Sequence, residues 1–342
     1  MNKFKLFWIK VFHYIKKFPV LVFLAFFIPT SIYTVRYLFA NEVQFNHLYY
    51  FGERLKVNHD KFHVTNIKPL FKVLNISSYS NYQGGACYEN YYALCSNNYE
   101  CLLIYDMKTN KVEHTIYTNE TNTDYHCNTM FFGTDFFSAE DKFPLLYISQ
   151  ENAYEPCTIV CRIYQIGGVW KIKVVSTIII NFDKNNKLYY PNSYFDYSNG
   201  ILYYAGYTKN SYFKSDDNKL RFHSFYLPDF RYNEVRLNPN EALATFEVDS
   251  ETATQGGFVS DGYLYQTFSG LSEAAFPFKK EGETPKLRIT NLKEGKILTQ
   301  IEDLRVFGAA DEFENIAIAD NGKLYAHGNT HLQIYEFEYS DN

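Results

Sequence analysis

A short polar phrase occurs twice in this sequence, and it holds residue types that could bind a ligand. The first copy begins Gln83-Gly84-Gly85 and the second begins Gln255-Gly256-Gly257. Glutamine supplies both hydrogen-bond donors and acceptors, and glycine lets a backbone N–H approach a ligand closely. Each copy continues into a short apolar strand, a tight turn and an aromatic strand. We therefore expect binding chemistry at the start of a recurring strand unit, and not in a phosphate loop, because no helix follows either copy.

Three further short polar segments precede apolar strands in the same way. They begin at His126-Cys127-Asn128, Tyr190-Pro191-Asn192 and Asp311-Glu312. We call these three segments, together with the two glutamine-glycine segments, the corners. If the units form a ring, their first strands line one channel and the corners meet at one mouth, the usual place for a ligand. The alternative is that these side chains only bind trapped water and one another. The candidate binding residues are Gln83, Gly84, His126, Asn128, Tyr190, Asn192, Gln255, Gly256, Asp311 and Glu312.

The same corners hold a limited set of groups for catalysis. His126 could act as a general base because an unperturbed imidazole titrates near neutrality, with Asp311 or Glu312 as its partner across the channel. The sequence lacks the nucleophile-elbow, zinc-protease, Walker and dinucleotide motifs. Glycosidases with five blades need carboxylates at several successive first strands, and here only the last corner is rich in them. A binding module for a glycan, peptide or protein is the first reading, and a hydrolase or lyase with His126 as base is the alternative.

A second phrase repeats in the same order as the first and describes an outer hairpin. Residues 104–112, closing at Ile116, match residues 289–297, closing at Ile301, with the same spacing of twelve. Residues 271–283 of the later copy read as an insertion. Two different phrases that each recur, and in the same order along the chain, indicate an internal structural repeat.

Weaker copies between and after these phrases bring the total to five units. The third unit is expected to place its outer strands at 220–227 and 234–237, and the last unit shows three strands. A strand from residues 63–75 could complete it, since closing a ring with both termini removes free sheet edges. The sequence therefore predicts an all-β five-bladed β-propeller. Six blades are the alternative, and a β-sandwich explains the repeats less well.

The first forty residues are of a different kind. Five lysines precede the apolar run 18–35, which has nearly the length needed to span a bilayer. We expect a cytoplasmic basic segment at 1–17, an uncleaved transmembrane signal-anchor at 18–40, a stalk at 41–62 and the propeller at 63–342. Lysines before the apolar run place the bulk of the chain on the extracytoplasmic side. A cleaved signal peptide is the alternative.

Composition and cysteine spacing argue against several classes of protein function. The net charge is -5 and no block rich in Lys or Arg follows residue 40, so nucleic acid is not an expected partner. The 32 Tyr and 31 Phe favour strands and could stack on sugars. Six cysteines between 87 and 161 permit disulfides in an exported protein, or they are buried thiols. Their spacing fits no zinc site, and we expect no metal and no cofactor.

Several of these phrases together resemble a family of bacterial extracytoplasmic β-propeller proteins with no established activity. The resemblance covers residues 80–340 and rests on six phrases, which begin at Gln83, His126, Phe143, Tyr189, Gly206 and Ala253. It implies the propeller fold and the extracytoplasmic side, and it implies no mechanism. Relatives often open the last blade with a Glu-Gly phrase, from which residues 311–315 depart.

Overall fold

The fold was analysed in a computed structural model. It describes residues 57–74, 82–97, 99–118, 126–151, 156–182, 187–211, 215–228, 233–268, 284–309 and 311–342. The expected basic segment 1–17 and signal-anchor 18–40 lie outside these ranges, and so does the stalk up to residue 56. Within the described ranges, no helix has the length and apolar character needed to cross a membrane.

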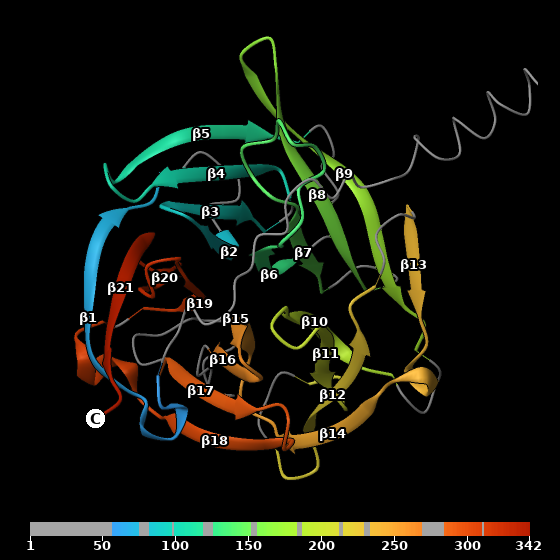
Figure 1. Ribbon diagram of the computed structural model, residues 1–342. Helices are drawn as coiled ribbons and strands as arrows, with labels where there is room; N and C mark the ends of the chain where they lie inside the picture. Colours follow the sequence, from blue (N-terminus) through green and yellow to red (C-terminus); the bar gives the residue numbers. More distant parts are fainter. Residues whose placement is uncertain are drawn as a thin grey trace, which may run out of the picture. The chain divides into compact units, whose positions relative to one another are not determined.

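Five sheets, in which nearly all neighbouring strands are antiparallel, stand around one axis, as Figure 1 shows. Blade 1 holds β2 (Tyr82–Tyr88), β3 (Tyr91–Ser96), β4 (Cys101–Asp106) and β5 (Lys111–Tyr117). Blade 2 holds β6 (Cys127–Phe132), β7 (Leu146–Gln150), β8 (Cys157–Ile166) and β9 (Val169–Ile180). Blade 3 holds β10 (Tyr189–Asp196), β11 (Ile201–Tyr207), β12 (Lys219–Tyr226) and β14 (Ala244–Asp249). Blade 4 holds β15 (Thr254–Ser260), β16 (Tyr263–Phe268), β17 (Lys286–Asn291) and β18 (Lys296–Ile301).

Blade 5 closes the ring with strands from both ends of the propeller, so the five-bladed prediction is confirmed. It holds β19 (Phe313–Ile318), β20 (Leu324–Gly328) and β21 (Gln333–Ser340), and β1 (His63–Lys72) adds the outer strand. The β1–β21 register runs from His63 opposite Ser340 to Lys72 opposite Gln333. Pro69 lies on this edge strand beside a register shift, where its missing N–H costs no hydrogen bond within the sheet.

One expected outer strand belongs to a different blade. Strand β13 (Glu234–Leu237) pairs in parallel with β9 and becomes the fifth strand of blade 2. The outer strand of blade 3 is instead β14, which pairs with β12. The expectation that 234–237 completes the third unit was therefore wrong. A four-residue strand with alternating burial carries no sequence information about its partner.

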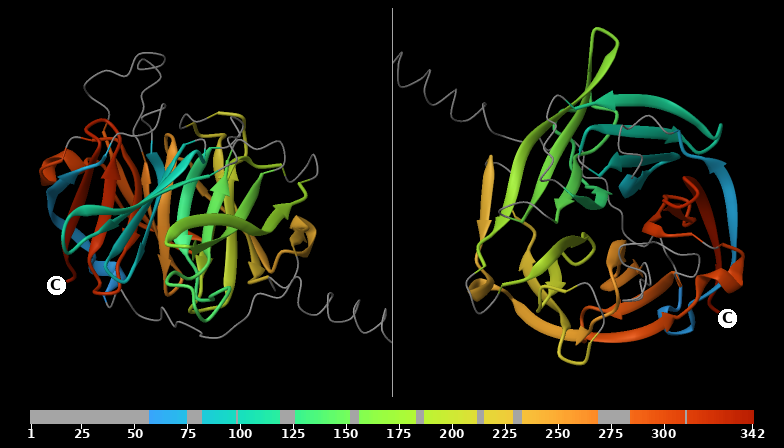
Figure 2. Two further views of the ribbon diagram at one scale, coloured as in Figure 1. Left: turned by 90° about the horizontal axis from the view of Figure 1, so that it is seen from above. Right: turned by 180° about the vertical axis from the view of Figure 1, so that it is seen from behind.

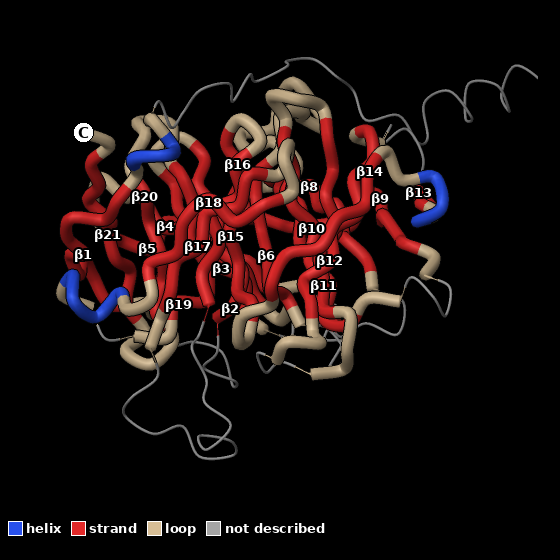
Figure 3. Tube along the Cα trace, turned by 90° about the horizontal axis from the view of Figure 1, so that it is seen from below, coloured by secondary structure: helices blue, strands red, loops and turns tan. Residues whose placement is uncertain are grey.

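The hydrophobic core lies between neighbouring blades. One cluster joins blades 1 and 2, another blades 4 and 5, a third blades 5 and 1, and a fourth blades 3 and 4. The inner strand β2 is buried along its whole length, whereas the outer strand β5 alternates exposed and half-buried positions, and of its residues Ile116 is buried. This gradient explains why inner strands read as continuous apolar runs and outer strands alternate. Figure 3 shows the strands crossing the thickness of the ring.

Short segments outside the blades are anchored to them. The 3₁₀ helices are η1 (His59–Lys61), η2 (Pro239–Glu241) and η4 (Leu304–Phe307). Just after η1, Phe62 is buried against the rings of Tyr265 and Tyr339. His59 stacks on Tyr263 at 3.9 Å between ring centroids. Residues 57–62 therefore pack on blades 4 and 5, although the sequence suggested a stalk there.

All six cysteines are free thiols, and five of them are buried. Cys95, Cys127 and Cys161 belong to the core between blades 1 and 2. Burial among neighbouring thiols raises the pKa of the Cys95 thiol. Of the two readings that the spacing allowed, buried thiols are the one the structure has.

Candidate functional site

All five inner strands carry a β-bulge near their first residues. In β2 the pairing passes from Tyr82 to Gly85, and in β15 from Thr254 to Gly257, while the partner strand advances by one residue fewer. Strands β6, β10 and β19 show the same irregularity. The residues left out of the ladder are 83–84, 128–129, 190–191, 255–256 and 314. We call them the bulge ring.

The bulge ring explains why the predicted corners are polar. A bulged residue leaves the ladder, so its side chain and backbone groups are turned away from the partner strand. Gln83, Asn128, Tyr190 and Gln255 all lie in the ring, as do Gly84 and Gly256. Figure 2 shows from two sides that the inner strands carrying these residues surround the axis of the propeller.

Three of the predicted residues meet at this end of the channel, which we call the polar end. His126 Nε2 lies 3.2 Å from Gln83 Oε1, and this contact links blades 1 and 2. Asn128 Nδ2 donates to the carbonyl oxygen of Thr254 at 3.3 Å, which links blade 2 to blade 4 across the axis. Gln255 follows Thr254 and is 8% exposed. Three non-consecutive parts of the chain therefore converge here.

Glu151, just after β7, is the carboxylate of this group, and the sequence reading did not include it. Its Oε2 accepts a hydrogen bond from Asn128 Nδ2 at 2.9 Å and lies 3.7 Å from His126 Nε2. Burial raises the pKa of Glu151 to about 8 and lowers the pKa of His126 to about 4. Both groups are therefore neutral at pH 7, and 27% of the His126 side chain stays exposed to an incoming ligand.

Two buried amide groups at the polar end have atoms with no hydrogen-bond partner. They are Asn128 Oδ1 and Asn192 Nδ2. Asn192 uses its other amide atom, Oδ1, to accept a hydrogen bond from Thr129 Oγ1 at 3.0 Å. An unsatisfied buried polar atom costs about 1–3 kcal/mol, so water or a ligand group is expected to satisfy each of them.

The glycines of the ring have a packing role. A Cβ on Gly84 would lie 2.8 Å from Met130 Cβ, and one on Gly256 would lie 2.7 Å from Asn315 Cβ and 3.2 Å from the Asn128 carbonyl oxygen. Such distances are too short for any other residue without movement of the strands. The sequence reading placed a ligand beside these glycines, whereas the structure places neighbouring inner strands there. The glycines therefore allow neighbouring inner strands to approach closely at the bulges.

The remaining predicted residues lie apart from this group in their described contacts. Tyr190 has φ of 52° and donates its hydroxyl at 2.8 Å to Oδ1 of the exposed Asn210, which lies between β11 and β12. Asp311 accepts from Thr330 N and Tyr335 Oη, both at 2.8 Å, and so holds the turn between β20 and β21. Glu312 is 6% exposed. In blade 5 the bulge residue is Glu314, so aligning the bulges would have selected it.

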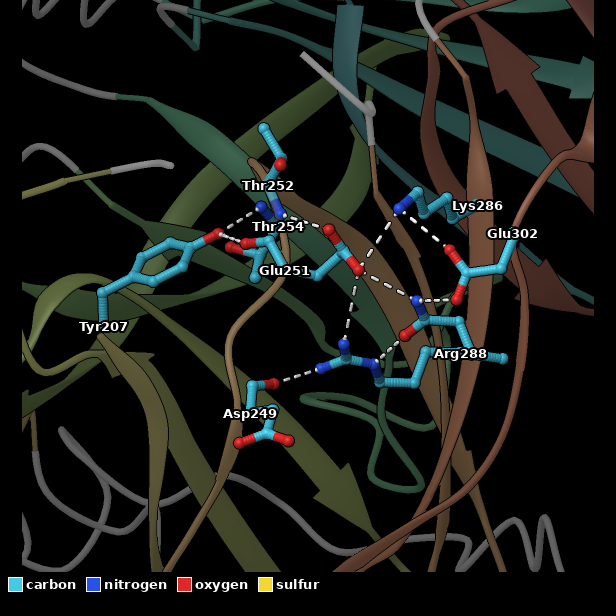
Figure 4. A network of polar contacts seen from close by, with 9 residues as sticks. Tyr207, Asp249, Glu251, Thr252, Thr254, Lys286, Arg288 and Glu302 are labelled. Carbon is cyan, nitrogen blue, oxygen red and sulfur yellow. Dashed lines mark hydrogen bonds and ion pairs between the residues drawn. The ribbon is translucent and has the colours of Figure 1, made fainter. Parts of the chain in front are cut away.

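A buried ion network holds the segment that enters β15, as Figure 4 shows. Glu251 Oε2 lies 3.3 Å from Lys286 Nζ and 3.8 Å from Arg288 Nη2, and the Arg288 and Glu251 side chains are 2% and 1% exposed. Glu251 Oε1 accepts from Thr252 N at 3.1 Å, and Tyr207 Oη donates to the Glu251 carbonyl oxygen at 2.9 Å. The network therefore fixes the backbone of 251–254, which presents the Thr254 carbonyl to Asn128.

The described residues contain no group of three or more His, Cys, Asp or Glu side chains placed to hold a metal ion. The arrangement at the polar end can instead do two things. Its amides can bind the hydroxyl or amide groups of an uncharged ligand, and the Glu151–His126 pair can exchange a proton with it.

No protein-family model matches the sequence, and no curated protein matches it either. Solved structures with a similar fold include the glutaminyl cyclase of Myxococcus xanthus, with 11% identity over 82% of this chain and 96% of that one and a TM-score of 0.46. The PQQ-bound aldose sugar dehydrogenase of Streptomyces coelicolor has 10% identity over 82% and 99%, with a TM-score of 0.47. The hydrazine synthase of Kuenenia stuttgartiensis has 11% identity over 72% and 62%, with a TM-score of 0.37. At such identities and scores we take no function from them.

Proposed function

We propose that this protein is a membrane-tethered module that binds a ligand at the polar end of its propeller. The apolar run within residues 18–40 is the proposed tether, and the propeller then lies on the extracytoplasmic side. The single observation that supports binding is the convergence of Gln83, His126, Asn128 and Glu151 with buried amide atoms that lack a partner.

The ligand class follows from the charge of these groups. The amides carry no charge, and both members of the Glu151–His126 pair are neutral at pH 7. A charged ligand would lose its hydration without meeting a counter-ion. We therefore expect a neutral ligand, and a glycan fits better than a peptide or protein because its hydroxyls both donate and accept.

A thermal-shift screen of the full-length chain against neutral glycans and uncharged peptides tests the proposal. A ligand at 100 times its Kd stabilises the folded state by about 2.7 kcal/mol. The Gln83→Ala, Gln255→Ala double variant should lose this shift. Gln165→Ala is the matched control, because Gln165 lies on the exposed β8–β9 hairpin and bonds only to the Gly168 carbonyl oxygen in the described contacts. Equal ligand-induced thermal shifts in the double variant and the control would show that the ligand does not bind at the polar end.

A hydrolase or lyase at the same site is the second candidate function, and the distance between His126 and Glu151 favours it. The expected partner of His126 was Asp311 or Glu312, but the carboxylate found within 4 Å is Glu151 at 3.7 Å. A carboxylic acid that stays protonated at neutral pH can donate a proton to a leaving group. Glu151→Gln should then abolish turnover of a ligand that it still binds, and unchanged turnover would exclude Glu151 as the acid.

A further inference from the structure

A second cavity lies at the opposite end of the channel, where the inner strands finish. Its volume is about 80 Å³, and all five inner strands contribute to its wall. The apolar part of the wall includes Ala86, Phe131, Phe195, Phe258, Ile316 and Ile318. We call this cavity the apolar end.

Packed aromatic rings make the wall rigid. The ring centroids of Phe131 and Phe195 are 4.3 Å apart, and Phe131 stacks on Tyr147 at 5.3 Å. On the other side of the cavity Phe258 stacks on Tyr265 at 4.9 Å. A preformed apolar cavity binds without the cost of ordering its walls.

The charge at this end is balanced. Asp261 is the charged residue of the lining, and its Oδ1 lies 2.9 Å from Lys293 Nζ. The other polar side chains of the lining are the hydroxyls of Tyr194, Tyr197, Ser198 and Ser260, together with the thiol of Cys87. The lining therefore favours an apolar body with a small uncharged polar head, and it leaves a charged ligand without a partner.

We propose that the apolar end is a ligand site for a small uncharged molecule with a short aliphatic chain and a hydroxyl or amide head. The volume sets the size of the chain. A dry cavity of about 150 Å³ holds benzene, so a cavity of about 80 Å³ encloses about three carbons of the chain, and the rest of the molecule lies at the open rim. The aliphatic chain lies between the aromatic rings, and the head faces the hydroxyls of Ser198 and Ser260.

Methyl NMR of the full-length chain tests this site directly, with 1-butanol as the probe. Met130 contributes to the cavity wall, whereas Met107 lies in the β4–β5 turn of blade 1. In protein labelled at methionine methyl groups, 1-butanol should shift the Met130 signal with saturation and leave Met107 in place. Butylammonium and butyrate, which match its length but carry charge, should bind at least tenfold more weakly.

Two variants that obstruct the cavity from different blades complete the test. Ser260→Trp on β15 and Ile318→Trp on β19 should each abolish the Met130 shift, with the protein's thermal transition retained in at least one of them. The site is overturned if the Met130 shift survives in a folded variant, if Met107 moves equally, if the charged probes bind as well as 1-butanol, or if no saturable shift occurs.

Discussion

The two ends of one channel are built from the same five strands and have opposite chemistry. At the polar end the strands are bulged, and amides, an imidazole and a buried carboxyl group meet. At the apolar end the same strands pair regularly and surround a cavity with aromatic rings. The bulge is the difference, because an extra unpaired residue turns polar groups toward the axis, whereas regular pairing sends alternate side chains into the cores between blades.

The two ends are also held in different ways. Buried charges fix the segment 251–254 at the polar end, through Arg288 and Lys286. Ring packing alone accounts for the described contacts of Phe131 and Phe195 at the other end. Breaking a buried charged pair is more costly than loosening a ring contact, so substitutions at the two ends should differ in their effect on stability.

Removing the central cation of the network should have the largest effect. Arg288→Met leaves Lys286 as the remaining cation described beside the buried Glu251 carboxylate, and we expect the free energy of unfolding to fall by about 3 kcal/mol. Chemical denaturation measures it. Arg305→Met removes an exposed pair with Asp303 and should cause no measurable change. Equal effects of the two substitutions would contradict the role given to the network.

Adding a methyl group where two inner strands approach closely should have the next largest effect on the free energy of unfolding. Gly256→Ala places a Cβ 2.7 Å from Asn315 Cβ and 3.1 Å from the Glu314 carbonyl oxygen, and the strands must separate. We expect a loss of about 2 kcal/mol in the free energy of unfolding. Gly167→Asn is the control, because Gly167 lies in an open hairpin at φ +57°, which asparagine tolerates. A Gly256→Ala protein as stable as the wild type would mean that the neighbouring strand does not approach Gly256 this closely.

The Glu151 carboxyl group should make stability depend on pH above neutrality. The folded protein keeps this proton up to about pH 8, whereas an unfolded chain releases it near the ordinary value of 4.5. The contribution of protonated Glu151 to the free energy of unfolding is therefore complete below pH 4.5 and is lost as the pH rises toward 8. Burial lowers the pKa of His126, His223 and His327 to about 4. These histidines therefore increase the free energy of unfolding as the pH rises from about 4 to 6.5, which is opposite to the effect of Glu151.

Between pH 6.5 and 8 the change in the free energy of unfolding therefore comes mainly from Glu151. We expect the wild-type free energy of unfolding to fall by about 2 kcal/mol across it, and Glu151→Gln should remove most of that fall. Denaturation curves at the two pH values give both numbers. If the variant and the wild type showed the same slope, the polar end would not contain a carboxyl group that is neutral at pH 7.

The smallest effect is expected at Tyr190. Its hydroxyl bonds to the exposed Asn210 between β11 and β12, so Tyr190→Phe should change the free energy of unfolding by no more than about 0.5 kcal/mol. Ligand binding at the polar end should be unaffected in the same thermal-shift assay. Loss of binding would show that Tyr190 belongs to the site, as the sequence pattern predicted.

The repeated phrases were sufficient to predict five blades and their closure by β1. They marked the strand starts correctly because glycine and glutamine recur at the bulges. They did not show Glu151 or Glu314, since neither residue belongs to a repeated phrase and each reaches the axis only through the arrangement of the blades. They also misplaced β13, whose partner lies in the preceding blade.

The sequence by itself determined the strands, their grouping into units and the polar character of one end, because these depend on local periodicity and on turn and bulge residues. Only the tertiary structure decided which polar groups meet, that glycine serves the approach of neighbouring strands, and that a carboxyl group becomes neutral beside His126. These properties depend on distances between blades and on burial from water, and residues far apart in the chain set both.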